Sequence, residues 1–235
     1  MRFKSSLVSG KLVRRYKRFL ADVLLETGET ITAACPNTGS MLGLNDPGNT
    51  VWLSRSDSLT RKYPFTWELV EIPDIGLVGI NTARPNHIVG EAITQKKITA
   101  LDGYAALRSE VKYGQNSRID ILLEGGNRPA CYVEVKNVHF FRKPGLAEFP
   151  DCVTARGTKH LVELANMVRN GARAVMVYLI QCDKPSRFAL ADDKDTIYFN
   201  EFRQARLAGV EALALTCHVS TDEISLEKSI PVVET

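Results

Sequence analysis

Two Glu-x-Lys triplets and one aspartate lie close together near the middle of the sequence. The triplets contain Glu110 with Lys112 and Glu134 with Lys136, and Asp120 stands between them. Asp and Glu oxygens are the ligands that Mg²⁺ and Mn²⁺ prefer, and cationic side chains bind phosphates. These residue types suit metal-assisted hydrolysis of a phosphodiester, in which the metal activates water while Lys136 positions that water or neutralises the charge developing on the phosphate.

Two short turns decide whether these side chains meet. If the second hairpin is centred on Asn127, Asp120 faces Glu134, and if the first is centred on Gln115, Glu110 faces Asp120. The same registers place three cations in the adjacent row: Lys112, Arg118 and Lys136. Like charges about 5 Å apart destabilise a sheet. A metal ion bound to the row of carboxylates and a phosphate bound to the row of cations would neutralise the charges of both rows. The competing interpretation is a solvated strand face with cross-strand ion pairs, because a one-residue slip of either turn would scatter the rows.

The strands that carry these residues form a predicted antiparallel meander with short Gly/Asn turns, over residues 105–113, 117–124 and 130–138. Apolar residues at helical spacing predict helices over 85–98, from a cap at Thr154 to a stop at Asn170, and over 196–207. Apolar strands are predicted at 174–180 and 210–217. A strand, a helix and a buried strand in succession form a βαβ unit, so we expect an α/β domain with a mixed sheet flanked by helices.

The first part of the chain has a different pattern, in which short β-type runs are broken by turn residues. The runs cover residues 20–25, 30–34, 50–53, 66–72 and 77–80. Short strands at this spacing predict a small barrel, and a five-stranded OB-like β-barrel is the expected type. We therefore expect two domains, an OB-fold-like nucleic-acid-binding domain at 1–81 and the α/β domain at 82–235.

The sequence is nearly neutral, with 30 Lys and Arg against 27 Asp and Glu, so a nucleic-acid surface has to be local. Seven basic residues and no acid precede Asp22. Four of them are the phosphate candidates: Arg14, Arg15, Lys17 and Arg18. Tyr16 and Phe19 alternate with these cations and could stack on bases, although barrel core is the simpler interpretation of both.

Two further groups of cations are weaker candidates for nucleic-acid binding. Arg61 and Lys62 form a second basic patch in the barrel sequence. The first turns of the helix that begins after Thr154, where the helix N-terminus also favours an anion, add three candidates: Arg156, Lys159 and His160. A structural ion pair with Glu163 is the alternative role for the cations on this helix face.

Composition and cysteine usage limit the class of protein. With 44% apolar and 24% charged residues, the chain is neither disordered nor collagen-like. Five scattered cysteines without a C-x-x-C spacing argue against a disulfide framework and against a zinc site. No uncharged run approaches the roughly 18 residues of a membrane span, and no signal-peptide core follows Met1. We expect a soluble cytoplasmic protein without a membrane partner.

Long strings of the sequence closely resemble the bacterial sugar fermentation stimulation protein family: Arg14–Val23, Cys35–Met41, Arg61–Leu69, Glu110–Gly114, Ser117–Asp120 and Phe149–Leu161. An acid, a hairpin and Glu-x-Lys in this order also resemble the PD-(D/E)xK nuclease core. The resemblance implies an OB barrel followed by a PD-(D/E)xK nuclease-like domain, DNA binding and a regulatory link to sugar (maltose) metabolism. It also implies that Asp120 and Glu134 bind metal and Lys136 assists attack, while the extra acid is either Glu91 or Glu110.

Two functions from different classes follow. The first is a DNA-binding protein without strong sequence preference that carries a Mg²⁺- or Mn²⁺-dependent nuclease site. The second is a catalytically inactive DNA-binding regulator on a nuclease fold. No recognition helix is evident in the sequence, so we expect contact with single- or double-stranded DNA mainly through phosphates. A homo-oligomer is compatible with the sequence.

Overall fold

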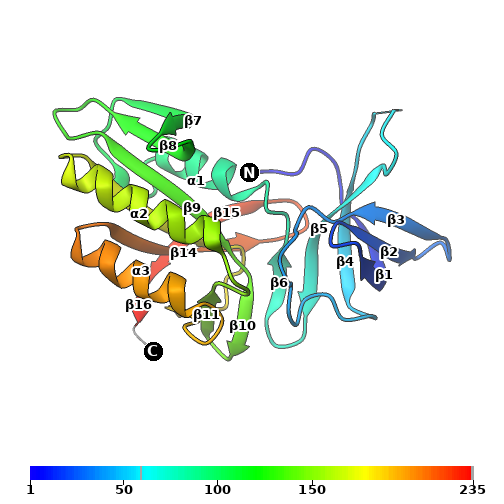
Figure 1. Cartoon of the computed structure of the whole chain (residues 1–235). Coiled ribbons are helices and arrows are strands. Elements are labelled where there is room, and N and C mark those ends of the chain that lie inside the picture. Colours follow the sequence, from blue (N-terminus) through cyan, green and yellow to red (C-terminus); the bar gives the residue numbers. More distant parts are fainter. Residues whose placement is uncertain (59, 234–235) are drawn as a thin grey trace.

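Alternating apolar residues near the N-terminus build a closed five-stranded barrel, coloured blue to cyan in Figure 1. The computed structural model describes residues 1–58 and 60–233. The barrel strands are β1 (Val8–Tyr16), β2 (Leu20–Leu25), β3 (Thr30–Ala34), β4 (Thr50–Arg55) and β5 (Phe65–Ile72). They pair in the order β3-β2-β1-β4-β5, and a parallel pairing of β3 with β5 closes the barrel. The predicted OB-like barrel is confirmed, with β6 (Gly76–Gly79) added beside β5.

The inward-facing side chains of these strands form the barrel core. Leu12, Val23, Val51 and Trp67 are at most 2% exposed. Burial of a large apolar side chain contributes roughly 1.5–3 kcal/mol, so these positions hold the strands in one register.

The second region contains a six-stranded mixed sheet, as the sequence predicts. Its strands, in order across the sheet, are β15 (Ile224–Ile230), β14 (Glu211–Val219), β12 (Arg173–Ile180), β9 (Cys131–Val138), β8 (Ser117–Glu124) and β7 (Ala106–Tyr113). β7, β8 and β9 form the predicted antiparallel meander, whereas β9, β12 and β14 are parallel. Parallel neighbours need crossover connections, and two helices supply them.

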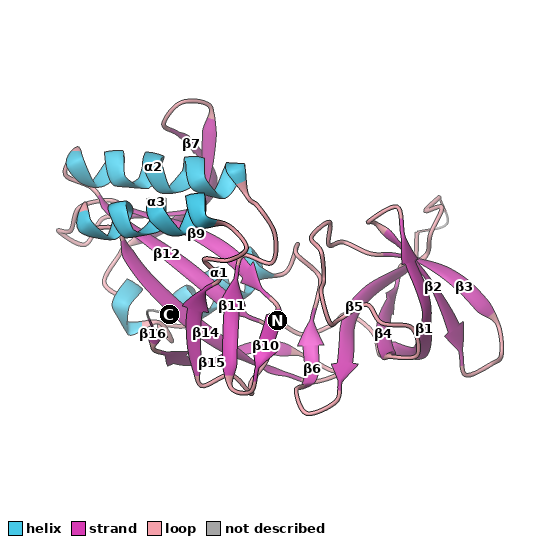
Figure 2. Ribbon diagram, turned by 60° about the horizontal axis from the view of Figure 1, so that its bottom comes forward, coloured by secondary structure: helices cyan, strands magenta, loops and turns pink. Residues whose placement is uncertain are grey.

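Helices cover both faces of this sheet. α1 (Pro85–Thr94) packs on one face, and α2 (Ala155–Arg169) and α3 (Thr196–Leu207) lie side by side over the other (Figures 1 and 2). Thr154 caps α2 by accepting a hydrogen bond from the Gly157 amide at 3.1 Å. α1 is shorter than the helix predicted over 85–98, because Lys96 has a left-handed φ of 56° and a 3₁₀ turn, η1 (Thr99–Leu101), follows.

A small second sheet is absent from the sequence-based prediction. It contains β10 (Phe140–Lys143), β11 (Leu146–Phe149), β13 (Arg187–Leu190) and β16 (Val232–Val233). Runs this short cannot show a clear alternation of apolar and polar residues. β15 is also absent from the prediction, because the middle of this strand is polar and exposed.

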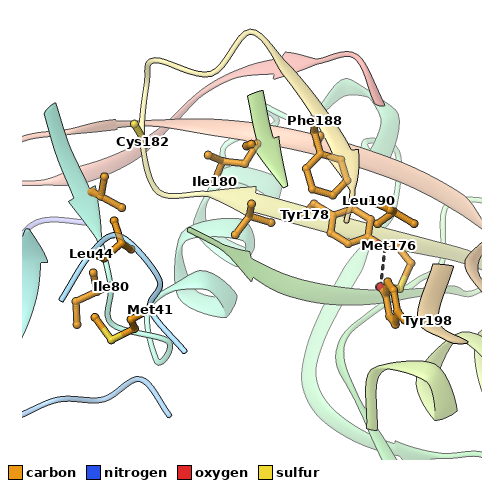
Figure 3. Packing of buried hydrophobic residues seen from close by; sticks show 14 of the residues in the cluster. Met41, Leu44, Ile80, Met176, Tyr178, Ile180, Cys182, Phe188, Leu190 and Tyr198 are labelled. Carbon is orange, nitrogen blue, oxygen red and sulfur yellow. Dashed lines mark hydrogen bonds between the residues drawn. The ribbon is translucent and has the colours of Figure 1, made fainter. Parts of the chain in front are cut away.

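The barrel packs directly against the second region. Met41, Leu44 and Ile80 belong to one buried cluster with Ile180 and Cys182 of the second region (Figure 3). A backbone hydrogen bond of 2.8 Å joins the last residue of β6 to the residue after β12. The two regions are therefore held together by a shared core. Among the residues that the structure describes, no helix is long and apolar enough to cross a membrane.

Candidate metal and nucleic-acid site

The register of the meander brings the predicted carboxylates to one end of β8 and β9. Ile121 pairs with Val133, which is the register of a hairpin centred on Asn127. Asp120 and Glu134 therefore occupy neighbouring positions just beyond this pair, as the sequence predicts.

Asp120 accepts two hydrogen bonds where β8 and β9 separate. Its Oδ2 accepts from the backbone amide of Val135 at 2.7 Å, and its Oδ1 accepts from the side-chain amide of Asn86 at 2.8 Å. Asn86 lies in the first turn of α1, so this helix also orients the acid. The sequence identifies Asn86 only as part of a helix start, because the contact spans 34 positions.

Glu134 lies at the centre of a charged cluster and is 2% exposed. Its Oε1 accepts a hydrogen bond from Lys136 Nζ at 2.7 Å and contacts Nδ1 of His160. Its Oε2 has no hydrogen-bond partner among the described residues. A buried carboxylate oxygen without a donor is a position where a metal ion or an ordered water fits.

The two carboxyls differ in how readily they ionise. Burial raises the pKa of Asp120, and the nearby charge of Glu134 raises it further. Burial also opposes ionisation of Glu134, but the hydrogen bond from His160 and the charge of Lys136 outweigh it and lower the pKa of Glu134. A cation beside both carboxylates would remove the repulsion between them.

This donor set fits an open Mg²⁺ or Mn²⁺ site. Mg²⁺ keeps several waters and usually binds through one or two carboxylates together with substrate phosphates. Within residues 1–58 and 60–233, no three Asp, Glu, His or Cys side chains are arranged to hold a metal by themselves. Asp120 and Glu134 would therefore share the ion with water and phosphate oxygens.

In the part of the chain that the structure describes, neither expected extra acid forms a hydrogen bond with these two carboxylates. Glu91 forms an ion pair with the N-terminal amine of Met1 at 2.7 Å. Glu110 is exposed, and its left-handed φ of 55° accompanies a gap in the pairing of β7 with β8. The pairs on either side of this gap keep the predicted register, but Glu110 and Asp120 are not paired between them.

Two cations on the meander are free of internal partners. Lys112 and Arg118 pair across β7 and β8 and are exposed, and their side chains form no hydrogen bond or ion pair with any described residue. With Tyr113 and Ser117 they line a hollow of about 370 Å³. Lys136, which the sequence places in the same row, is instead bound to the neighbouring carboxylate.

The candidates on α2 are divided between the protein interior and the surface. His160 is 4% exposed and contacts Glu134. Lys159 donates to a carbonyl oxygen of the β7–β8 turn at 2.8 Å and lies 3.7 Å from Glu163, which is the ion pair that the sequence allows. Arg156 is exposed, with its Nε 3.4 Å from His160 Nε2. Arg156 and Lys159 therefore lie at the surface, whereas His160 is buried.

The turn between β1 and β2, with the residues next to it, is called the barrel turn below. Most of its basic residues bind other parts of the barrel. Arg15 donates to three carbonyl oxygens at 2.8–2.9 Å, two of them in the loop 35–41. Arg18 donates to another carbonyl oxygen of that loop at 3.0 Å. Arg14 pairs with Asp22 at 2.8 Å. These guanidinium groups organise the turn and the loop beside it.

The tip of the same turn is open to solvent. Lys17 is exposed and has no polar partner among the described residues. Phe19 is 52% exposed, which contradicts the core position expected for it. Left-handed backbone at Lys17 (φ 49°) and Arg18 (φ 65°) makes a tight turn that leaves the phenylalanine outside the barrel. Tyr16 is half-buried and donates a hydrogen bond to Asp22 at 3.2 Å.

The second basic patch of the barrel is partly occupied. Arg61 donates to the hydroxyl of Thr66 at 2.8 Å. The ammonium of Lys62 lies 5.5 Å from the centre of the Tyr63 ring. A cation–π contact at an exposed site is weak, so Lys62 remains available to a phosphate.

Comparison with known proteins agrees with this architecture. A family model described as the SfsA N-terminal OB domain matches residues 13–80, and one described as the sugar fermentation stimulation protein RE domain matches residues 83–223. Sugar fermentation stimulation protein homologs of Brucella ovis and Brucella melitensis are each 55% identical over 232 residues, which cover 99% of this chain and 97% of theirs.

A solved structure has the same fold over almost the whole chain. It is SfsA of Pyrococcus furiosus in complex with Ca²⁺, which is 25% identical, has a TM-score of 0.89, and matches over 99% of this chain and 98% of its own. The matched models cover the barrel and the α/β region separately, in the order that the structure shows. The chain belongs to the sugar fermentation stimulation protein family.

Proposed function

We propose that this protein binds DNA mainly through phosphates, without strong sequence preference, and hydrolyses phosphodiesters at a Mg²⁺ or Mn²⁺ site formed by Asp120 and Glu134. The observation that carries the proposal is the buried Glu134 carboxylate, which has one oxygen on Lys136 and one without a donor among the described residues. A bound metal would supply an activated water and a Lewis acid there. The Ca²⁺ complex of the Pyrococcus furiosus relative supports a divalent ion.

The protein's own residues would hold and complete this site. Asn86 keeps the Asp120 carboxylate in place through its hydrogen bond of 2.8 Å. His160 orients Glu134 from α2. Lys136 keeps its ammonium beside the carboxylates, where it could neutralise the charge that develops on the attacked phosphate.

Three exposed cations whose side chains have no polar partner among the described residues are the strongest candidates for phosphate contact: Lys17, Lys112 and Arg118. Lys112 and Arg118 lie on β7 and β8, next to the carboxylates. Six other proposed cations must give up an internal hydrogen bond before they bind a phosphate: Arg14, Arg15, Arg18, Arg61, Arg156 and Lys159. Lys62 has only its weak cation–π contact with Tyr63. DNA would thus run from the meander toward the barrel turn.

A second candidate function is a DNA-binding regulator without catalysis. The pairing of Lys136 with Glu134 favours it, because this ion pair already neutralises the carboxylate. The family name links its members to sugar fermentation, and we extend to this chain a regulatory role in sugar use. We also place the domain boundary at residues 81 and 82 and the protein in the cytoplasm, where its five unpaired thiols would stay reduced.

A cleavage assay tests the enzyme against the regulator. Purified protein is incubated with single- and double-stranded DNA in Mg²⁺, Mn²⁺ or EDTA, beside Glu134→Gln and Lys136→Ala. We expect metal-dependent cleavage that falls by at least about 100-fold in both variants. Cleavage that survives in both variants would point to a contaminant. Intact DNA with undiminished DNA binding would favour the regulator.

A further inference from the structure

Three buried oxygens beside the candidate site have no hydrogen-bond partner among the described residues: Glu134 Oε2, Glu163 Oε2 and the Tyr113 hydroxyl. Their residues are 2%, 7% and 8% exposed, respectively. Buried polar atoms in proteins are nearly always paired, and an exception often marks an ion or an ordered water. Three exceptions on adjoining elements indicate a bound species.

Glu163 reaches this place from α2. Its Oε1 accepts a hydrogen bond from the Gln115 amide in the β7–β8 turn at 3.2 Å. Gly114 permits the approach, because a Cβ at this position would lie 3.0 Å from Glu163 Oε1. Tyr113 directly precedes this glycine at the end of β7. The Glu163 carboxylate and the tyrosine are therefore neighbours.

Tyr113 lies in the field of several carboxylates. Burial raises the pKa of its hydroxyl, and Glu134 and then Glu163 raise it further. The hydroxyl has no hydrogen-bond partner among the described residues, so its oxygen can be offered to a cation. Lys136 Nζ lies 2.7 Å from Oε1 of Glu134, and Lys159 Nζ lies 3.7 Å from Oε1 of Glu163. The Oε2 atoms of both glutamates accept no hydrogen bond from the described residues, so their lone pairs are available to a cation.

We propose that a second divalent cation binds between Glu134 Oε2 and Glu163 Oε2, with the Tyr113 hydroxyl as a third ligand. This inference rests on the proposed function, because Glu134 would also bind the ion that Asp120 shares. Hard oxygen ligands of this kind suit Mg²⁺, Mn²⁺ or Ca²⁺. The hollow of about 370 Å³ is lined by Tyr113 and Gly114 and therefore lies beside one of the three proposed ligands.

The chemical consequence is a pair of ions that share one carboxylate. Such a pair can stabilise the attacking and the leaving oxygen of a phosphodiester at the same time. Glu163 would then take the place for which the sequence offered Glu91 and Glu110. The acid comes from the helix after the Glu-x-Lys strand instead of from the elements before it.

The test is the number of Mn²⁺ ions bound by the intact chain, measured by equilibrium dialysis and by calorimetry. We expect two ions for the wild type and one for Glu163→Gln. For Tyr113→Phe, the affinity for one of the two ions should fall at least about tenfold. Matched controls are Glu201→Gln on α3 and Tyr132→Phe, whose ring centre lies 5.5 Å from that of Tyr113. Both should bind ions like the wild type.

Asp120→Asn separates this inference from the proposed function. One wild-type ion that disappears in Asp120→Asn and persists in Glu163→Gln would overturn the second site and leave the nuclease site standing. No bound ion in the wild type would overturn both. Melting temperatures in Mn²⁺ and in EDTA provide a readout that does not depend on activity, since ligand binding stabilises the folded state. Mn²⁺ should raise the wild-type melting temperature more than that of Glu163→Gln, and equal shifts would contradict the second site.

Discussion

The barrel turn between β1 and β2 and the strand pair β7–β8 both carry cations that could bind DNA, but they differ in how these charges are used. In the barrel turn, Arg15 and Arg18 donate to carbonyl oxygens of the loop 35–41 and hold it in place. On β7 and β8, Lys112 and Arg118 contact no polar group of the described residues. One group of cations stabilises the fold, and the other is available to a ligand.

A high local density of cations therefore does not identify a binding surface by itself. A guanidinium that already donates to backbone oxygens has to break these bonds before it binds a phosphate, at a cost of roughly 1.5–3 kcal/mol for each. An unpaired lysine loses only side-chain freedom. The distinction can be tested by comparing variants of the two regions.

The largest expected effect is on stability, at Arg15. Arg15→Ala should lower the free energy of unfolding by about 2–3 kcal/mol, because carbonyl oxygens beside the turn lose their charged donor. Urea denaturation measures the change. Arg14→Ala is the matched control, since Arg14 pairs at the surface with Asp22 and should matter little. Equal losses in the two variants would contradict the structural role of Arg15.

The second largest expected effect is on DNA binding by the two exposed cations of the meander. Replacing both Lys112 and Arg118 by Ala should reduce the slope of log affinity against log salt by about 2, because each cation is expected to neutralise one phosphate. Fluorescence anisotropy with a labelled oligonucleotide at several salt concentrations measures this slope. The control pair is Arg61→Ala with Lys62→Ala, whose side chains already have internal contacts. If only the control pair changes the slope, the phosphate-binding residues lie on the barrel.

A smaller effect on DNA binding should distinguish Lys17 from its neighbour Arg18 in the barrel turn. Lys17→Ala should reduce the salt slope by about 1, whereas Arg18→Ala should reduce it less, because Arg18 is held by a carbonyl oxygen at 3.0 Å. The same anisotropy titrations measure both. A larger change for Arg18 would show that DNA displaces this internal hydrogen bond.

The smallest effect concerns the contact that joins the two regions. The Asp151 carboxylate accepts a hydrogen bond from Ser40 at 2.8 Å and lies 3.4 Å from His139. Burial opposes its ionisation, but the hydrogen bonds from His139 and Ser40 outweigh burial and lower the pKa of Asp151. A lowered pKa contributes stability that is fully present above the unfolded pKa of about 3.9 and is lost as the pH falls below it.

The predicted consequence is that Asp151→Asn unfolds with a weaker pH dependence in acid. The free energy of unfolding, measured from pH 7 to pH 3, should fall less steeply below about pH 4 in the variant than in the wild type. Asp183→Asn is a control, because Asp183 forms no ion pair in the described chain. Parallel curves for wild type and Asp151→Asn would remove this carboxylate from the acid response.

Local patterns explain what could be predicted of the fold. The meander is joined by short turns, so its registers follow from alternation, and Asp120 and Glu134 meet as predicted. α3 has the predicted bounds, Thr196–Leu207. The strands of the small sheet are absent from the prediction, because runs of two to four residues carry too little periodicity.

The details of the site were less accessible from the sequence. Asn86 contacts Asp120 across 34 positions, and His160 contacts Glu134 across 26. The sequence predicts Glu163 only as an ion-pair partner of Lys159, although α2 also carries its carboxylate to the β7–β8 turn. No local pattern reports such contacts, because they depend on how a helix packs over a sheet.

The sequence by itself determined the order of the two domains, the pairing of the meander strands and the set Asp120, Glu134 and Lys136, since these follow from alternation and turn length. Only the tertiary structure decided which charges are free. Arg15 and Lys112 are both cations on β-strands, yet one is bound to carbonyl oxygens and the other faces solvent. The reason is physical: a side chain's partners come from segments distant in sequence, and packing determines whether they are within hydrogen-bond reach.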